Sequence, residues 1–443
     1  MLDRAEVEGI CDLVLEASSA EETEVVVTAG EEALTRYANN LIHQNVWEAN
    51  LSVSIRAVVG KKIGVASTND ARPEALRQAV EQAALLASLA PENPEFPGLP
   101  AAPPAEPGPV PSPATIAATP RQRGEVVAQV LEIARGADLV ASGALETSHS
   151  ALAVANSRGA RAYTEMTRAS MSAVMTLGES SGRADAYLVD FTDLDPAALG
   201  RTAADKALAG RDLQRLEPGP YTVLLEPSAV ANLLMALGQS GFNALAYQEK
   251  RSFLCEKLGK RVMDARLNLV DDGRDLRGLP MIFDFEGVPK QRVELVKDGV
   301  AVGMVHDTRT AAQADPPVAS TGHALPAPNP WGPVPINLFL ESGPDSREEM
   351  LASVERGLLV TRFHYTNLVH PLHTVLTGMT RDGTFLVEGG QIVAGVHNMR
   401  FTQSILEALD KVERIGDKGV QCGYAWAPAL TVRDFIFTGV SQS

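Results

Sequence analysis

The amino-acid sequence predicts an α+β protein, in which a duplicated N-terminal region of helices and antiparallel strand meanders precedes a β-rich C-terminal domain with a curled sheet. Two observations predict this class. Within residues 1–215, a helix, a set of strand-like segments and a second helix occur in that order twice, which favours antiparallel meanders over a parallel sheet with alternating helices. Within residues 220–443, strand-like segments separated by glycine-containing turns are dense and helices are short. We therefore expect these two ranges to form separate structural regions.

The first unit is expected to begin with a helix, because Asp3 and Glu6 have the spacing of a capping box and apolar residues then recur at helical spacing. A second helix over residues 73–88 begins with a proline and closes the unit. Between these helices we expect strands that turn at Gly30 and at Gly60. The strand-like segments span residues 22–28, 32–38, 40–48, 50–58 and 62–68.

The second unit repeats this order. Its first helix is expected after Thr119, where a cap residue is followed by proline at the first helical position. A later segment alternates clearly, with Met171, Ala173 and Met175 on one face of the predicted strand. Its closing helix begins at Pro196, and both closing helices start with the pattern Pro-x-Ala-Leu. This correspondence supports an internal duplication.

A proline-rich segment, residues 91–120, lies between the two units and contains eleven prolines. Such a composition favours extended polyproline II backbone and cannot form a hydrogen-bonded ladder or a core. We therefore expect an exposed, semi-rigid linker. Recognition of a partner by this segment is the alternative interpretation.

The C-terminal half is expected to be mostly β, with a closed or strongly curled sheet. Three glycine-containing sequences between apolar runs are typical of tight hairpin turns. These turns are Lys297-Asp298-Gly299, Arg381-Asp382-Gly383 and Glu388-Gly389-Gly390. A capping-box pattern predicts a helix that begins after Ser346 and ends near Gly357. The spacing of apolar residues predicts a last helix over about residues 402–414.

Composition restricts the classes of function. The 443-residue chain has a formal net charge of −16 and a pI near 5.0, which opposes direct binding to nucleic acid, since there is no net attraction to phosphates. Three scattered cysteines do not make a disulfide framework. The N-terminal sequence has no continuous signal-peptide core, and no apolar run is long enough to span a membrane. We expect a cytoplasmic protein.

Several motifs succeed one another in the C-terminal half. A strand-like run leads into a predicted helix in the sequence YTVLLEPSAVANLLMALGQSG, residues 221–241. The later motifs are Val270-Asp271-Asp272-Gly273, Phe285-Glu286-Gly287-Val288-Pro289, Leu295-Val296-Lys297-Asp298-Gly299, Ser320-Thr321-Gly322-His323, Thr361-Arg362-Phe363 and residues 376–390. In order and spacing this succession resembles the TldD/PmbA metallopeptidase family, and residues 361–363 and 376–390 resemble its TldE/PmbA branch most.

The resemblance has consequences for metal binding. In the zinc-bearing TldD branch, the helix after the Leu-Leu pair carries His-Glu-x-x-x-His. Here the two histidine positions are Met235 and Ser240, and the position of the general-base glutamate is Ala236. A zinc hydrolase needs about three protein ligands and an open position for water, so we expect a chain without metal or other cofactor. The resemblance implies a subunit that joins a zinc-bearing TldD-like subunit and helps to enclose an extended peptide.

Two alternatives to this interpretation remain open. The first is a homodimeric, non-enzymatic protein that binds peptides. The second is a self-sufficient hydrolase with a relocated metal site at His364, His370 and His373, because imidazole is a common zinc ligand. The sequence Gly-Glu-Ser-Ser-Gly at residues 178–182 matches the letters of a nucleophile elbow, but strand-like flanks on both sides favour a hairpin loop.

Overall fold

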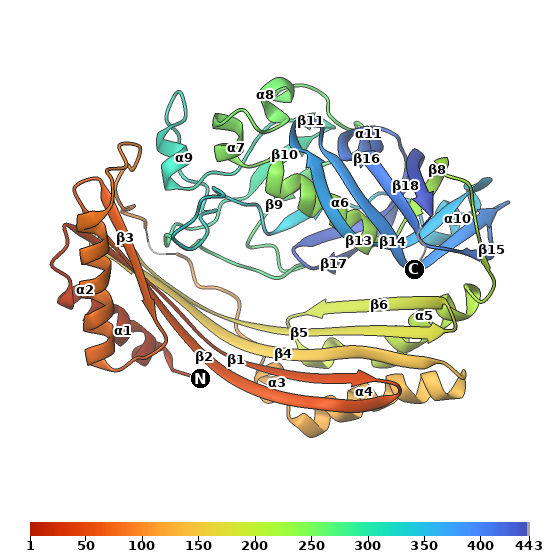
Figure 1. Ribbon diagram of the computed structural model, residues 1–443, viewed down its shortest axis with the longest axis horizontal. Coiled ribbons are helices and arrows are strands. Elements are labelled where there is room, and N and C mark those ends of the chain that lie inside the picture. Colours follow the sequence, from red (N-terminus) through yellow and green to blue (C-terminus); the bar gives the residue numbers. More distant parts are fainter. Residues whose placement is uncertain (104, 441–443) are drawn as a thin grey trace.

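The computed structural model describes residues 1–103 and 105–440, and it confirms the α+β class with a β-rich C-terminal domain (Figure 1). Its strands form two sheets, one with six strands in the N-terminal half and one with twelve strands in the C-terminal half. In Figure 1 the six-stranded sheet curves beneath the C-terminal domain. Among the described residues, no helix has the length and apolar character needed to cross a membrane.

The first unit contains three long antiparallel strands between two helices. Its elements are α1 (Arg4–Ala17), β1 (Glu22–Ala38), β2 (Leu41–Val59), β3 (Lys62–Thr68) and α2 (Pro73–Leu89). The predicted capping box of Asp3 and Glu6 is confirmed, but the predicted turn at Gly30 is wrong. Gly30 pairs with Asn50 on β2 and with Ser150 on β4, and a Cβ atom at residue 30 would lie 3.2 Å from that of Ser150. The glycine therefore allows close strand approach within one continuous strand.

The second unit has the same plan. Its elements are α3 (Pro113–Ile116), α4 (Pro120–Gly136), β4 (Val140–Asn156), β5 (Arg161–Leu177), β6 (Ser180–Leu188), η1 (Phe191–Asp193) and α5 (Pro196–Ala209). Thr119 caps α4 in a capping box with Gln122. Met171, Ala173 and Met175 are buried on one face of β5, as the alternating pattern predicts.

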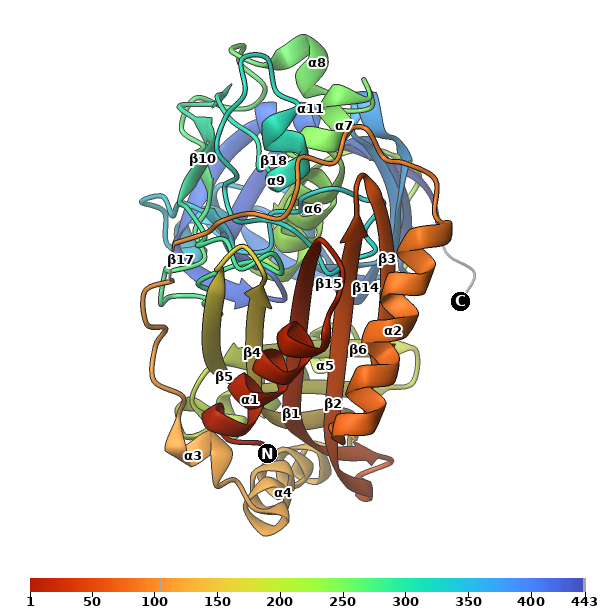
Figure 2. The same ribbon diagram turned by 90° about the vertical axis from the view of Figure 1, so that its left-hand side faces the viewer.

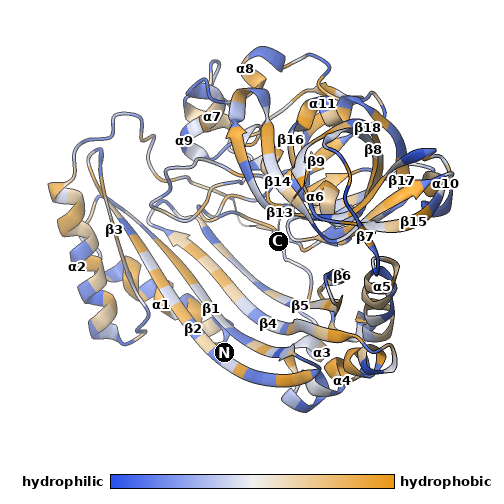
Figure 3. Ribbon diagram, turned by 45° about the vertical axis from the view of Figure 1, so that its right-hand side comes forward, coloured by the Kyte–Doolittle hydropathy of each residue, from blue (hydrophilic) through white to orange (hydrophobic). Residues whose placement is uncertain are grey.

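The two units join into a single antiparallel sheet with the order β3-β2-β1-β4-β5-β6. β1 pairs with β4 from Glu24 opposite Asn156 to Tyr37 opposite Gly143. Helices cover one face of this sheet (Figure 1), and side chains alternate between the faces, as the bands of hydropathy along the strands show (Figure 3). Val25 packs in the core that contains α1 and α2, whereas Val26 packs against the C-terminal domain.

The proline-rich linker is only partly as predicted. Residues 91–103 and 105–112 form no helix or strand, and residue 104 lies outside the described residues. Figure 2 shows the segment crossing the molecule and descending beside β5. However, it is not an exposed spacer: Phe96 and Leu99 are buried, and the Asn156 side chain donates a hydrogen bond to the carbonyl oxygen of Pro100 at 2.9 Å. The linker is held against the protein because these apolar side chains find a core.

The C-terminal domain is a curled sheet wrapped around one apolar helix. Its first elements are β7 (Leu213–Gln214), β8 (Gly219–Leu225), α6 (Pro227–Ser240), α7 (Ala244–Gln248), α8 (Leu254–Lys257), β9 (Leu269–Asp271), β10 (Val293–Lys297), β11 (Val300–Ala301), α9 (Thr308–Ala312) and β12 (Leu338–Leu340). The others are α10 (Arg347–Ala352), β13 (Arg356–His370), η2 (Pro371–His373), β14 (Val375–Glu388), β15 (Gln391–Val396), β16 (Met399–Ser404), α11 (Ile405–Asp410), β17 (Val412–Cys422) and β18 (Ala425–Val440).

Three predictions for this domain need correction. The predicted turn at Asp382 is a kink inside β14, where Asp382 has a φ of 54° and its carboxylate accepts hydrogen bonds from Arg362. The helix after Ser346 ends at Ala352, because the following residues form β13. The last helix spans only Ile405–Asp410, since the residues on either side pair in the sheet as β16 and β17. The hairpin turns at residues 297–299 and 388–390 are confirmed.

Candidate functional site

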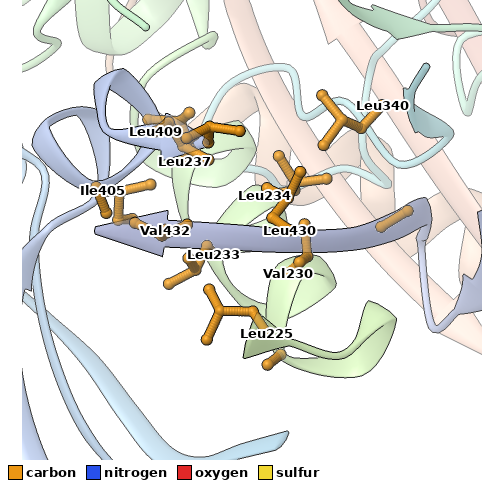
Figure 4. Packing of buried hydrophobic residues seen from close by; sticks show 14 of the residues in the cluster. Leu225, Val230, Leu233, Leu234, Leu237, Leu340, Ile405, Leu409, Leu430 and Val432 are labelled. Carbon is orange, nitrogen blue, oxygen red and sulfur yellow. The ribbon is translucent and has the colours of Figure 1, made fainter. Parts of the chain in front are cut away.

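Helix α6 presents two different faces. Proline at its first position and an apolar sequence start the helix after Glu226. Val230, Leu233, Leu234 and Leu237 are fully or almost fully buried against strands of the curled sheet (Figure 4). Each buried aliphatic side chain contributes about 1.5–3 kcal/mol relative to exposure, so this face fixes the helix in place.

The opposite stripe of α6 is formed by Met235, Ala236, Gln239 and Ser240, none of which is fully buried. The hydroxyl of Ser240 donates a hydrogen bond to the carbonyl oxygen of Ala236 at 2.7 Å. The thioether of Met235 lies 3.4 Å from the position that a Cβ atom on Gly423 would occupy. The stripe therefore offers a packed thioether, a methyl group, an amide and a hydroxyl bonded to its own helix. These groups do not fit a catalytic zinc ion, which needs imidazole, thiolate or carboxylate donors.

Cys422 ends β17 immediately before Gly423, so the fold places this cysteine beside the α6 stripe. Burial, followed by the negative charges of Asp185 and Glu226, raises the pKa of Cys422 to about 12. A thiol with this pKa stays protonated at neutral pH, whereas nucleophilic attack needs the thiolate. Cys422 is therefore not activated as a nucleophile in this structure.

A cavity of roughly 630 Å³ lies between the six-stranded sheet and the C-terminal domain. This volume is within the range of small-ligand sites. Residues 279–281 and 336–337 and Tyr424 line its upper wall, and residues 109–111 of the linker line one side. Residues next to two of these segments contact α6, because Pro335 lies 3.1 Å from a Cβ position at the buried Gly238 and Gly423 packs against Met235. The residues that line the cavity do not themselves include any of α6.

The sheet wall of this cavity is polar and mainly acidic. Glu32, Ser148 and Arg168 lie opposite one another on β1, β4 and β5, on the face that carries Val26. Glu146 lines the same wall, and its pKa is raised by burial and by the negative charge of Glu32. Hydroxyl, carboxylate and guanidinium groups can all pair with the backbone or side chains of a peptide.

Two of the sequence motifs and Lys290 meet in a buried network outside the cavity. The Nε2 atom of His323 lies 2.7 Å from Oδ1 of Asp271, and Nζ of Lys290 lies 3.4 Å from the same oxygen. All three side chains are at most 1% exposed. Although burial opposes it, Lys290 and His323 hold the pKa of Asp271 below its usual range. Burial and then Lys290 lower the pKa of His323, so its ring is neutral and donates from Nε2 to Asp271.

A second buried network joins the sheet to the C-terminal domain. Arg56 on β2 pairs with Glu24 on β1 at 2.7 Å and with Glu286 at 3.4 Å. Burial opposes the charge on Arg56, but the two carboxylates raise its pKa further. Glu286 also accepts a hydrogen bond from the backbone of Thr308 at 3.1 Å. The motif that contains Glu286 therefore has a structural role, because it holds the C-terminal domain against the six-stranded sheet.

The histidines of the relocated-site hypothesis lie on the β13–β14 hairpin. The rings of His370 and His373 are 4.4 Å apart at its exposed tip, whereas the ring of His364 packs on Tyr365. His364 pairs with Met379 and His370 with Val375, four residues along β14, which places His364 roughly 13 Å from His370 along the hairpin. Within residues 1–103 and 105–440, no three histidine, cysteine or acidic side chains are grouped as metal ligands would be.

The serines of residues 178–182 lie in the predicted hairpin between β5 and β6. Ser180 donates to the carbonyl oxygen of Ala207 at 2.7 Å, and Ser181 donates to Asp382 at 3.1 Å. Both hydroxyls therefore bond groups other than a histidine base, and the strand-turn-helix setting of a nucleophile elbow is not formed.

Sequence reasoning identified the α6 stripe but missed the cavity and the buried networks. The cavity walls come from residues as distant as Thr28 and Tyr424, and no local pattern joins them. The networks had a signal, because Asp271, Glu286 and His323 are ionisable residues within three of the motifs. That signal indicates buried pairing as readily as catalysis.

Family models and relatives agree with this architecture. The models described as PmbA/TldA metallopeptidase domain 1, central domain and C-terminal domain match residues 23–87, 114–211 and 218–439. The chain is 24% identical to Metalloprotease PmbA of Escherichia coli O157:H7 over 437 residues, which are 94% of this chain and 92% of that protein. It is 24% identical to a Metalloprotease TldD homolog of Haemophilus influenzae over 233 residues, 51% of this chain and 47% of that protein.

Two solved structures share the fold. TldE from Thermococcus kodakarensis superimposes with a TM-score of 0.87 at 21% identity, covering 98% of this chain and all of that chain. A protein from Thermotoga maritima MSB8, described as a putative modulator of a DNA gyrase, superimposes with a TM-score of 0.83 at 20% identity, covering 97% of this chain and all of that one. At these identities the likeness is one of fold.

Proposed function

Because this chain belongs to the PmbA/TldA metallopeptidase family across all three of its domains, we propose that it is a TldE/PmbA-like subunit without zinc, which works with a zinc-bearing TldD-like subunit. The observation that carries this proposal is the α6 stripe, where Met235, Ala236 and Ser240 occupy the positions of two ligands and a general base. Peptide hydrolysis then has to take place on the partner.

In peptide processing, the role of this subunit is to hold the substrate. The cavity between the six-stranded sheet and the C-terminal domain has a volume suited to a short stretch of extended peptide, and its floor is a β-sheet with polar side chains. A peptide on this floor would pair with Ser148, Ser150 and Arg168 and would exclude water from the acidic wall. The net charge of −16 opposes nucleic acid as a partner. We place this activity in the cytoplasm.

Metal analysis tests the proposal. Protein purified without chelator should contain less than about 0.1 zinc per chain, because the stripe has no imidazole, carboxylate or thiolate donor. A zinc-bearing homologue purified in parallel is the positive control. About one zinc per chain, lost when His370 and His373 are both replaced by alanine, would contradict the proposal and support the self-sufficient hydrolase.

A homodimeric, non-enzymatic peptide-binding protein is the second candidate. It rests on the same cavity, whose polar sheet wall could hold a peptide without any catalytic group. Fluorescence anisotropy with a labelled unstructured peptide separates the two candidates. Tight binding by this protein, unchanged when the homologue is added and followed by no cleavage, would favour the second candidate.

A further inference from the structure

The two repeats of the six-stranded sheet leave strand edge unpaired at corresponding places. β3 pairs with β2 only from Val53 onward, so residues 41–52 of β2 are bonded to β1 alone. In the second repeat, β6 pairs with β5 only from Ala169 onward, so residues 161–168 of β5 are bonded to β4 alone. A free edge exposes a row of backbone N–H and C=O groups that can pair with another strand.

The free edge of β5 is covered by the chain itself. The backbone N–H of Ser112 donates to the hydroxyl of Thr167 at 3.0 Å. A Cβ atom at Gly108 would lie 2.7 Å from the hydroxyl of Thr164, which shows how closely the linker follows this strand. The linker thus blocks any further pairing along residues 161–168 (Figure 2).

The free edge of β2 has no such cover. Most residues of the segment 41–52 are exposed, among them Leu41 at 64% and Trp47 at 59%. Proteins usually protect long edges with lysine, proline, bulges or covering loops. This segment, LIHQNVWEANLS, contains no lysine, arginine, proline or glycine, and Glu48 is its only carboxylate. At about 3.4 Å per residue it presents roughly 40 Å of unprotected strand.

We infer that residues 41–52 of β2 are the strand through which this chain pairs, edge to edge and antiparallel, with a second subunit of the same fold. The inference rests on the proposed function only for the existence of such a partner. A same-fold subunit carries an equivalent strand, and a two-fold axis sets two such edges antiparallel. Pairing would satisfy both rows of backbone groups at once and bury Trp47. The low charge of the segment leaves little repulsion to overcome.

The position of this edge also links assembly to the cavity. Asn50 lines the cavity, whereas Ile42 lies at the far end of the segment beside α4, 3.9 Å from a Cβ position at Gly124. A peptide held in the cavity can reach only the Asn50 end of the edge. A subunit with its own long β2 can cover the whole edge, and it would place a second sheet at the mouth of the cavity.

The double variant Trp47→Lys/Ala49→Lys tests the inference. Both side chains are exposed on one face of β2. In a pair of identical subunits the new lysines would lie close to each other and repel, and in a pair with a homologue they would place two positive charges in the interface. Light scattering after size-exclusion chromatography measures the mass of this protein alone and with the zinc-bearing homologue. We expect the double variant to assemble at least about ten-fold more weakly. Leu276→Lys, at a residue 72% exposed in the C-terminal domain, is the matched control and should assemble normally.

Hydrogen–deuterium exchange identifies the surface without any cleavage assay. Within residues 41–52, the amides that are not bonded to β1 should be protected in the assembled protein and should exchange rapidly in the double variant, while circular dichroism confirms that the variant is folded. Assembly that is unchanged in the double variant, with fast exchange along 41–52 throughout, would overturn the inference and leave the proposed function standing. Protection that appears only when an unstructured peptide is added would also overturn it, because the edge would then be a peptide site.

Discussion

The α6 stripe and the buried Asp271 network lie in the same domain and both come from the motifs of the family resemblance, yet they differ in chemistry. The stripe is partly accessible and carries no ionisable group. The network gathers a carboxylate, an ammonium group and an imidazole that are at most 1% exposed. In this chain the charged motif residues hold segments together, and the accessible stripe is chemically inert. Substitutions should therefore have large effects on stability in the network and small effects on the stripe.

The largest effect is expected from Lys290→Met. It removes the cation that neutralises Asp271, whose carboxylate is then buried with only neutral partners. Breaking a buried ion pair in this way costs about 3 kcal/mol or more. Urea unfolding followed by circular dichroism measures the change in free energy of unfolding. A loss below about 1 kcal/mol would show that the network does not stabilise the domain.

Acid should weaken the network in two steps. The folded-state pKa of His323 lies below its ordinary value of 6.5, so the unfolded chain binds a proton first and stability is lost as the pH falls below 6.5. The folded-state pKa of Asp271 lies below 3.8, so its contribution is present above that pH and is lost below it.

The variant His323→Gln isolates the first step, because its amide can still donate to Asp271 but does not titrate. Between pH 7.5 and pH 5, we expect the wild-type protein to lose more stability than this variant, because the unfolded chain binds the proton of His323 more readily than the folded protein does. Urea unfolding at each pH gives the two slopes. Equal slopes would mean that His323 binds its proton equally well in the folded and unfolded states.

The smallest effect is expected from Ser240→Ala on the α6 stripe. The hydroxyl bonds only the carbonyl oxygen of Ala236 within its own helix, so its loss should change the free energy of unfolding by less than about 0.5 kcal/mol. A loss comparable with that of Lys290→Met would erase the distinction between the two regions.

The triple substitution Met235→His, Ala236→Glu and Ser240→His sharpens the same comparison. It restores the motif letters but not the surrounding hydrogen-bond partners that orient zinc ligands. We expect no peptide cleavage by the variant, as measured by mass spectrometry of an unstructured peptide. Cleavage that requires added zinc would show that the site needs only those three residues.

Much of the fold could be predicted from local signals. Capping residues and proline located α1, α4 and α5, and alternation located β5. The errors occurred where distant pairing overrides local sequence. Gly30 is typical of a turn but lies in a strand, where Ser150 packs against it. Residues 402–404 were predicted as helix but pair with β14 in the sheet. For the site, the residues of the α6 stripe, and their lack of metal ligands, could be predicted from the sequence. The cavity could not, because it depends on strand pairings between distant parts of the chain.

The central claim is that this chain supports peptide cleavage by a zinc-bearing homologue but does not cleave by itself. The direct test is a cleavage assay on an unstructured peptide with this protein, with the homologue, and with both. A mixture containing a homologue whose motif glutamate is replaced by glutamine is the control for the origin of catalysis. The account predicts no turnover by this protein alone, turnover by the mixture above that of the homologue alone, and none in the control. Turnover by this protein alone at the rate of the mixture would contradict it.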